Sequence, residues 1–587
     1  MRSQNKPIPG SLFPMLLAAL LAGCASKVPL PPMPPLRPLP PVNLTPSAPA
    51  ASATASGPAY QPAETSPVSD MPAAVQAPAA NSANASSPAV AAPYGEAVAA
   101  RFPDPAVSYF TPAFEPGHAR FTSNAELHAF MQGLSARSTK TTSIQYLTIG
   151  YSQQGQPIDA LLFSRVPDPL ATDAQTAARP TVLLTAQQRG DEPAGAEAML
   201  VIAQRLSGAE LQAVLDRVNV VLVPRVNPDG AQAGRRTAAN GVDLDSDHLL
   251  LRTPEARAIA QVMREYKPMV VVDAQEFPAV AGWREKFGGF PSYDVLLQYA
   301  MTPNLPQFIT KASEEWFRRP MIAALDREKL RSQWYFTASP DAGDRSLSMG
   351  NISPSNERNA AGLRNSVGIL VATRGSDLGP VNLKRRVHAQ VVALSSALRS
   401  ATARSADLVK LRAYLDADVA AKVCQGELTV SASEAASEYR LTMLDPVTGA
   451  DMPMTVSWNS ALEFDNERKR PRPCGYWLSA DAIDAVTALR ALGANVQQLQ
   501  EPGVAQADSY APATRPGAAG GMTMKSSLMD VPTGSYYVGL DQPLGSLVLS
   551  AMEPDATDSY VSRGLVPRID QMARVTLPPN LKLGLVP

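Results

Sequence analysis

The sequence predicts an α/β fold, in which a mixed, mainly parallel sheet is covered by helices and a smaller α+β region follows. Apolar runs at 181–185 (TVLLT), 218–224 (VNVVLVP) and 269–272 (MVVV) are typical of strands buried on both faces. Helical patterns at 193–206 and 253–266 separate these runs. Because strands that alternate with helices form parallel sheets, this order predicts a sheet covered on both sides.

Further elements complete this domain. Residues 123–126 (SNAE) form a capping box ahead of an amphipathic helix at 127–134. The segments 144–149 and 158–163 predict a hairpin, because a glycine-containing turn separates them. The later part of the domain is expected to contain helical segments within 305–325, a strand at 368–371 and a helix at 387–398.

The composition excludes several classes of protein. The chain of 587 residues has 52 Lys and Arg against 53 Asp and Glu, a net charge of −1. This balance argues against a nucleic-acid partner, whose phosphates require a basic surface. Three Cys and four His exclude a disulfide scaffold and a Cys-rich or His-rich metal module. The hydrophobic share of 45% is enough for a sizeable core.

Residues 1–24 are predicted to be a lipoprotein signal peptide. A basic start precedes the apolar run 13–22, which is shorter than the roughly 20 residues of a membrane-spanning helix. The run ends in Leu-Ala-Gly-Cys, which is similar to the lipobox of bacterial lipoproteins and makes Cys24 the lipidated residue. No Asp stands beside Cys24, which predicts a lipid anchor in the outer membrane and a protein facing the periplasm. The alternative is an ordinary signal peptide with a chance cysteine.

The sequence divides the rest of the chain into three parts. Residues 25–105 are a tether rich in Pro, Ala and Ser, whose proline run at 28–42 favours polyproline II. The tether has too few large apolar residues to bury a core and is expected to be disordered. Residues 106–400 form the α/β domain, and residues 401–587 form a C-terminal accessory region.

Polar motifs follow the predicted strands at the edge where parallel sheets carry their working groups. They are QRGDE at 188–192, NPDG at 227–230, NGVDLDSD at 240–247, DAQE at 273–276 and VATRG at 371–375. In this order they resemble the zinc metallocarboxypeptidase family of the carboxypeptidase A type, in its bacterial lipoprotein branch. The resemblance covers about residues 121–398 and implies a carboxypeptidase-like sheet.

The resemblance implies a zinc ion held by two imidazoles and a carboxylate, with a Glu as general base. The metal-ligand positions fall on Arg189, Glu192 and Gln275, and the general-base position falls on Ala372. Arginine offers only hydrogen-bond donors, and an amide is a poor zinc ligand, so only Glu192 is retained. No cofactor is therefore expected, and zinc would be expected only if the family activity is kept.

The same resemblance assigns the substrate-binding positions. The Asn-Arg pair that holds a peptide's terminal carboxylate falls on Asp245 and Ser246, and an Asp there would repel that carboxylate. One of Arg235 and Arg236 matches the arginine that polarises the scissile carbonyl, and Arg374 is also kept. These arginines leave binding of a peptide or an acidic ligand open.

We expect Arg189 to reach Glu192 and donate two aligned hydrogen bonds, because an unpaired buried carboxylate is costly. The chain is then a degenerate carboxypeptidase of the cell envelope that binds or scaffolds peptides. One alternative is an active zinc carboxypeptidase that removes C-terminal residues with an unconventional metal site. The other is a purely structural envelope lipoprotein.

The C-terminal region is expected to begin with a connecting helix at 401–421. Strand-like segments lie at 427–430, 439–443, 454–456, 536–540 and 547–549, and Ser479 is a candidate cap for a helix at 481–492. Cys424 and Cys474 both belong to the exported part, and an oxidising periplasm would allow them to pair. The sequence does not give their distance.

Overall fold

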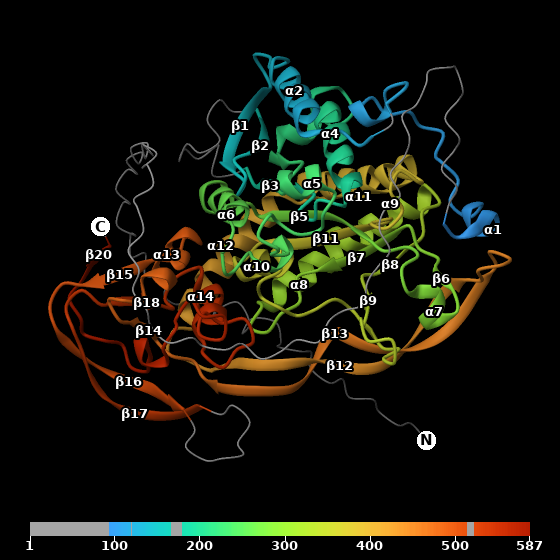
Figure 1. Ribbon diagram of the computed structural model, residues 1–587. Coiled ribbons are helices and arrows are strands. Elements are labelled where there is room, and N and C mark those ends of the chain that lie inside the picture. Colours follow the sequence, from blue (N-terminus) through green and yellow to red (C-terminus); the bar gives the residue numbers. More distant parts are fainter. Residues whose placement is uncertain (1–92, 119, 166–178, 513–521, 587) are drawn as a thin grey trace, which may run out of the picture. The chain divides into compact units, whose positions relative to one another are not determined.

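The structure is a computed structural model that describes residues 93–118, 120–165, 179–512 and 522–586 (Figure 1). These residues belong to one compact unit. The predicted signal peptide, Cys24 and the tether up to residue 92 lie outside the described residues. Folded structure begins earlier than the predicted start at residue 106, because Tyr94, Val98 and Phe102 are buried around helix α1 (Gly95–Ala99). Three apolar residues, each four positions after the last, are too few to indicate a helix in the sequence next to a segment rich in Pro and Ala.

The central sheet confirms the predicted fold class. Among the described residues it has eight strands, and β4, β3, β5 and β11 form its parallel centre. The order across the sheet is β1 (Ser143–Tyr151), β2 (Pro157–Ser164), β4 (Asn219–Val223), β3 (Thr181–Ala186), β5 (Val270–Phe277), β11 (Val367–Arg374), β7 (Val295–Tyr299) and β8 (Ser332–Trp334). The predicted hairpin is the antiparallel pair β1–β2, and β7 runs antiparallel to β11.

Alternate residues of the central strands face opposite sides of the sheet, as the two-residue period of a strand requires. Val182 and Leu184 belong to the large core that includes helices α4 (Pro193–Ser207) and α11 (Leu383–Ala403). Leu183 belongs to a second core that includes α6 (Pro254–Tyr266). The sheet is therefore buried on both faces, which explains why its strands are continuous apolar runs in the sequence.

The remaining helices connect or flank these layers. The predicted capping box is present at the start of α2, where Ser123 accepts from the backbone of Glu126 and the Glu126 side chain accepts from Ser123. The predicted helical stretch at 305–325 contains α8, a turn of π-helix at Ser313–Arg318 and α9. The other helices are α2 (Asn124–Ser135), α5 (Pro228–Ala233), α7 (Trp283–Phe287), α8 (Gln307–Ala312), α9 (Arg319–Arg327), α10 (Glu357–Leu363), α12 (Ser405–Ala421), α13 (Ile483–Ala491) and α14 (Gly545–Met552). Short 3-10 turns lie at Pro112–Phe114, Gln212–Asp216, Leu244–Ser246 and Ile569–Gln571.

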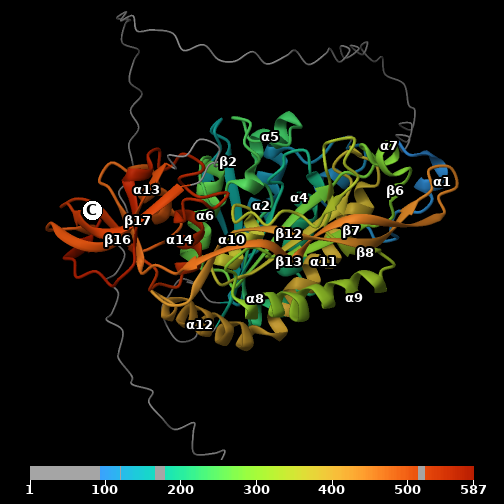
Figure 2. The same ribbon diagram turned by 90° about the horizontal axis from the view of Figure 1, so that it is seen from below.

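A long hairpin joins the two predicted parts of the chain. Its strands β12 (Glu427–Leu444) and β13 (Asp451–Pro471) pair with β6 (Phe290–Pro291) and with β10 (Leu347–Ser348), which continues to β9 (Thr337–Ala338). Figures 1 and 2 show the hairpin running along the α/β domain. Trp458 of β13 is part of the large core, so the chain after residue 400 shares a core with the segment before it.

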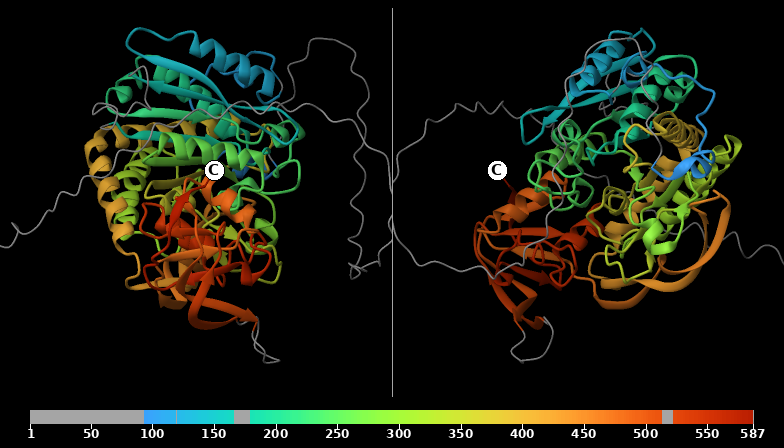
Figure 3. Two further views of the ribbon diagram at one scale, coloured as in Figure 1. Left: turned by 90° about the vertical axis from the view of Figure 1, so that its left-hand side faces the viewer. Right: turned by 45° about the vertical axis from the view of Figure 1, so that its right-hand side comes forward.

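The last part of the chain forms a sheet of seven strands among the described residues (Figure 3, orange and red). Their order is β17 (Met522–Val531), β16 (Gly503–Pro512), β19 (Met572–Val575), β14 (Gly475–Leu478), β18 (Tyr536–Gly539), β15 (Val496–Leu499) and β20 (Leu583–Leu585). The strand predicted at 547–549 is wrong, because these residues lie in α14. A short apolar run fits a buried strand and a buried helix equally well, and α14 is buried along its whole length.

Cys424 and Cys474 form a disulfide, which ties the segment before β12 to the segment before β14. The two cysteines are 50 residues apart in the sequence. The described residues contain no helix with the combined length and apolar character that crossing a bilayer requires.

The disulfide predicts a measurable loss of stability on its removal. In the chain-entropy description, the loop of 50 residues limits its contribution to roughly 4 kcal/mol. We expect the Cys424→Ser, Cys474→Ser variant to unfold at lower denaturant concentration than the wild type. A reductant should shift the wild type to the same midpoint and leave the variant unchanged. Equal midpoints for the oxidised wild type and the variant would contradict this prediction.

Candidate functional site

The candidate site lies at the carboxyl ends of β3 and β5. The loop 187–192 leaves β3 and enters α4, and Gly190 sits at its centre. A Cβ atom at Gly190 would lie 2.0 Å from the carbonyl carbon of Gly230 in α5. Only glycine tolerates this approach, so backbone packing fixes the loop that carries Arg189 and Glu192.

The three residues predicted at the metal-ligand positions meet in the structure. Arg189 Nη1 donates a hydrogen bond to Gln275 Oε1 and lies 3.8 Å from Glu192 Oε1. All three side chains are buried, with exposed fractions of 7% for Arg189 and 1% for Glu192 and Gln275. The three side chains therefore lie close enough to form one site. The assignment of these residues to the family's ligand positions stays a prediction.

Two aspartates complete the surroundings of Arg189. Its Nη2 donates to Asp245 Oδ2 at 3.2 Å, and its Nε donates to Asp243 Oδ2 at 3.3 Å. We call Arg189, Glu192, Asp243, Asp245 and Gln275 the Arg189 cluster. Burial alone would lower the pKa of Arg189, but Glu192, Asp245 and Asp243 outweigh it and hold that pKa well above its ordinary value. The guanidinium therefore stays charged.

Glu192 is held differently from the expectation. Its Oε2 accepts from the backbone N–H of Glu276 at 2.8 Å, while its Oε1 lies 3.8 Å from both Arg189 Nη1 and Arg236 Nη1. The expected pair of aligned hydrogen bonds from Arg189 is wrong, because that guanidinium donates to Gln275, Asp245 and Asp243 instead. Burial raises the pKa of Glu192 to about 8, although both arginines oppose this shift.

Ala372 lies next to this cluster on β11. It is fully buried and pairs with Gln275 of the parallel strand β5. A methyl side chain has no group that can accept a proton from water. The position to which the resemblance assigns the general base thus adjoins the cluster and carries no base.

The structure separates the two candidate arginines at 235 and 236. Arg236 donates to Asp243 Oδ2 from Nη2 at 3.1 Å, and its side chain is 47% exposed. Arg235 is exposed, and among the described residues no hydrogen bond or ion pair joins its side chain to the cluster. Ser246 is also exposed and donates to the backbone oxygen of Asp243. Of these three residues, only Arg236 can contribute charge to the site.

Arg374 lies apart from the cluster. Its guanidinium carbon stacks 4.1 Å from the ring centre of Phe102, and its Nη1 donates to the backbone oxygen of Pro291. Burial lowers its pKa, although Tyr94 opposes the shift. These contacts give Arg374 a packing role, and the substrate-binding role assigned to it stays a prediction.

Three further residues of the site had no role predicted for them from the sequence. Asn356 donates to Asp245 Oδ2 at 2.9 Å, and Asp273 accepts from the amide of Gln275. The buried Tyr335 lines a pocket beside Arg189. Asp273 had a signal, because it is a polar residue at the end of an apolar strand. Asn356 is the N-cap residue of α10 and Tyr335 directly follows β8, and neither place in the sequence indicates a contact with this site.

A pocket of about 490 Å³ opens beside the cluster. Arg189 and Arg236 line it on one side, and Trp283, Tyr335 and Phe336 supply aromatic walls. The volume falls within the roughly 300–1,000 Å³ of small-ligand sites. Arg189 therefore lines a cavity and does not fill it.

Comparison with known proteins relates this site to a family. Residues 127–304 match the family model described as zinc carboxypeptidase. Carboxypeptidase 2 of Trichophyton rubrum is 24% identical over 472 residues, which cover 77% of this chain and 86% of that protein. Residues 127–304 are therefore similar to the zinc carboxypeptidase family. Carboxypeptidase D of Mus musculus is 27% identical over 157 residues, which cover 24% of this chain and 11% of that protein.

Solved structures in the same comparison are more distant. A metallo-carboxypeptidase from Burkholderia cenocepacia is 17% identical, with a TM-score of 0.34, over 47% of this chain and 68% of its own. The carboxypeptidase A from Helicoverpa armigera is 15% identical, with a TM-score of 0.36, over 48% of this chain and 74% of its own.

Zinc is the metal that the family implies, and the residues of the Arg189 cluster do not fit it. The guanidinium of Arg189 offers donors only, and the amide oxygen of Gln275 accepts from it. Glu192 is then the one remaining anionic ligand of the three positions. Among the described residues, no group of three or more His, Cys, Asp or Glu is placed to hold a metal ion. No hydrolytic step through zinc follows from these side chains.

The cluster predicts that Arg189 is essential for stability. Arg189→Met keeps an unbranched, mainly apolar side chain but removes the guanidinium, and it leaves buried carboxyl groups without their cation. Breaking a buried ion pair in this way costs about 3–5 kcal/mol, which urea unfolding would measure. The matched control is Arg235→Met, an exposed position where we expect a change within about 0.5 kcal/mol. Equal stability of the two variants would refute the role assigned to Arg189.

His248 predicts a pH dependence of stability. Its Nε2 and Gln188 Oε1 are 2.6 Å apart, and burial lowers its pKa from 6.5 to about 4. Between these pH values the unfolded chain binds a proton that the folded chain does not, so stability falls as the pH drops, by up to about 1.4 kcal/mol per pH unit. We expect His248→Gln to lose less stability than the wild type from neutral pH to about pH 5. Parallel curves for the two proteins would contradict the assignment.

Proposed function

We propose that the chain is an envelope lipoprotein whose carboxypeptidase-family domain has lost hydrolysis and binds or scaffolds peptides. One observation carries this proposal: the guanidinium of Arg189 lies between Glu192, Gln275 and Asp245 in the place where the resemblance puts the metal. A guanidinium supplies positive charge but has no position at which water can be bound and deprotonated. Ala372 offers no alternative base.

The pocket beside the cluster supports binding over a purely structural role. Trp283 and Phe336 present apolar surface for a peptide side chain, and the half-exposed guanidinium of Arg236 can donate to a backbone carbonyl. The cluster leaves about 490 Å³ of this pocket open, which is space that a peptide side chain can occupy.

Export to the cell envelope is supported by the disulfide between Cys424 and Cys474, because disulfides persist in oxidising compartments such as the bacterial periplasm. The lipid anchor on Cys24 and the placement at the outer membrane are part of the proposal and rest on the lipobox alone.

The second candidate is an active zinc carboxypeptidase, which the name of the Trichophyton rubrum relative favours. Zinc content of the purified protein distinguishes the two. After dialysis against trace zinc, we expect the wild type to hold far less than one zinc per chain. The Arg189→His, Gln275→His variant, which restores two imidazoles beside Glu192, should approach one zinc per chain. A wild type that holds stoichiometric zinc would refute the loss of the site.

The second arm of this experiment measures peptide binding by calorimetry with a mixture of short peptides. Ala338→Trp would fill the pocket from β9, and Ala436→Trp places the same side chain at an exposed position on β12. We expect binding to the wild type and to the Ala436→Trp control, and loss of binding in Ala338→Trp. Binding that survives in Ala338→Trp, or that is absent from the wild type, would leave the structural alternative as the better explanation.

A further inference from the structure

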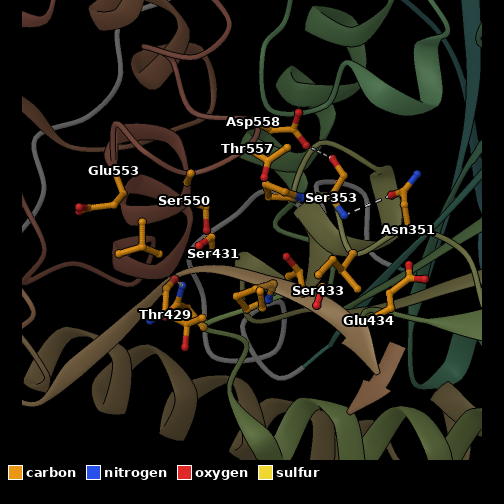
Figure 4. A pocket seen from close by; sticks show the side chains of 18 of the residues that line it. Asn351, Ser353, Thr429, Ser431, Ser433, Glu434, Ser550, Glu553, Thr557 and Asp558 are labelled. Carbon is orange, nitrogen blue, oxygen red and sulfur yellow. Dashed lines mark hydrogen bonds between the residues drawn. The ribbon is translucent and has the colours of Figure 1, made fainter. Parts of the chain in front are cut away.

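A second pocket lies where three segments of the chain meet (Figure 4). It has a volume of about 450 Å³ and is bounded by the loop 351–354, the start of β12 at 429–434, and the end of α14 with the turn at 556–558. Residues 302–304 close its remaining side. None of its lining residues belongs to the pocket beside the Arg189 cluster, so this is a separate site.

The charges around this pocket disfavour an ionic ligand. No Lys, Arg or His is among its lining residues, so an anion would find no counter-charge. Two of its carboxylates are already neutralised, because Glu553 pairs with Arg470 and Arg574, and Asp558 pairs with Arg563. In Figure 4 the carboxylate of Glu553 points away from the centre of the pocket. This leaves Glu434 as the carboxylate available to a ligand.

Several polar groups in the pocket have no partner within the described residues. The hydroxyls of Thr429, Ser431 and Thr557 make no hydrogen bond there, whereas Ser433 and Ser550 donate to backbone oxygens. Thr429 and Ser431 both line the pocket from β12, whose pairing with β13 is irregular between them. Figure 4 shows both side chains among those that line the pocket.

One carboxylate oxygen of Glu434 has a hydrogen-bond partner in the described part of the chain, and the other has none. Its Oε2 accepts from Ser348 Oγ at 2.6 Å, which fixes the carboxylate, and its Oε1 has no partner in the described part of the chain. A fixed carboxylate can accept hydrogen bonds from neighbouring hydroxyls of a ligand. The apolar carbons of Ile352, Pro354 and Leu549 supply the remaining surface.

We propose that this pocket binds an uncharged sugar of one or two rings. A sugar offers hydroxyls that donate and accept, which matches the unpaired Ser and Thr hydroxyls, and C–H faces that pack on the apolar carbons. An apolar ligand would bury those hydroxyls without partners, at a cost. The volume of the pocket falls within the range of small-ligand sites.

An extended peptide is the alternative ligand for this pocket. The hydrogen bonds at the edge of β12 disfavour it. Peptides commonly bind such an edge by adding a strand through backbone hydrogen bonds. Here the side chain of Asn304 already takes both backbone groups of Thr429: its Nδ2 donates to the Thr429 oxygen at 2.8 Å, and its Oδ1 accepts from the Thr429 N–H at 2.9 Å. Strand addition is blocked at this end of the pocket.

Calorimetric titration of the full-length protein tests the proposal. The probes are glucose, galactose, mannose and N-acetylglucosamine with their disaccharides, and acetyl-trialanine amide serves as an uncharged peptide. We expect at least one saccharide to bind with saturation. Ser431→Leu places a larger apolar side chain in the pocket and should weaken that binding at least about tenfold. The matched control is Ser457→Leu, at an exposed position of β13 outside the pocket, which should leave the affinity unchanged.

A second variant covers the case in which Ser431→Leu fails to fold. Glu434→Gln keeps the shape of the side chain and its bond from Ser348, but removes the charge that strengthens hydrogen bonds from a sugar. We expect a several-fold loss of affinity with an unchanged circular dichroism spectrum. The proposal is overturned if no saccharide in the panel binds, if both pocket variants bind sugar as the wild type does, or if the peptide binds at this pocket in place of sugar.

Discussion

The ends of β3 and β5 depend on the buried guanidinium of Arg189. The carboxyl groups of Glu192, Asp243 and Asp245 lie within 4 Å of it, and the buried Asp245 would be costly to bury without a cation. The guanidinium is equally costly to bury without them. Because these acids come from two separate loops, the mutual requirement holds the loops against the sheet, and it determines the floor of the pocket beside them.

The central sheet could be predicted from the sequence because its strands are buried on both faces. Residues 181–185 and 218–224 are continuous apolar runs for that reason, and the helices between them carry their own period. Apolar runs do not identify the type of element when a buried element is short. Gly545–Met552 is a buried helix whose apolar run reads as a strand, since its length does not separate the two periods.

The site could be predicted only as far as strand order determines it. Arg189 and Gln275 follow or end neighbouring parallel strands, so their meeting follows from topology. The contributions of Asn356, which donates to Asp245, and of Tyr335, which lines the pocket beside Arg189, were not predicted, because both residues lie far along the chain from β3. The sequence could also not predict which acidic groups accept hydrogen bonds from Arg189. Its side chain is long and flexible, and the distances to the nearby acids depend on the fold.

Arg189 supplies positive charge among these carboxyl groups but cannot coordinate them as a metal ion would. In the described part of the chain, Glu192 Oε1, Asp245 Oδ1 and Asp273 Oδ1 are buried acceptors without a hydrogen-bond partner, even though Arg189 neutralises the region. A metal ion would bind such oxygens from several directions, whereas a planar guanidinium donates only in its own plane. The fold therefore contains an internal cation that is covalently part of the chain, and we expect its stability to depend on that one side chain.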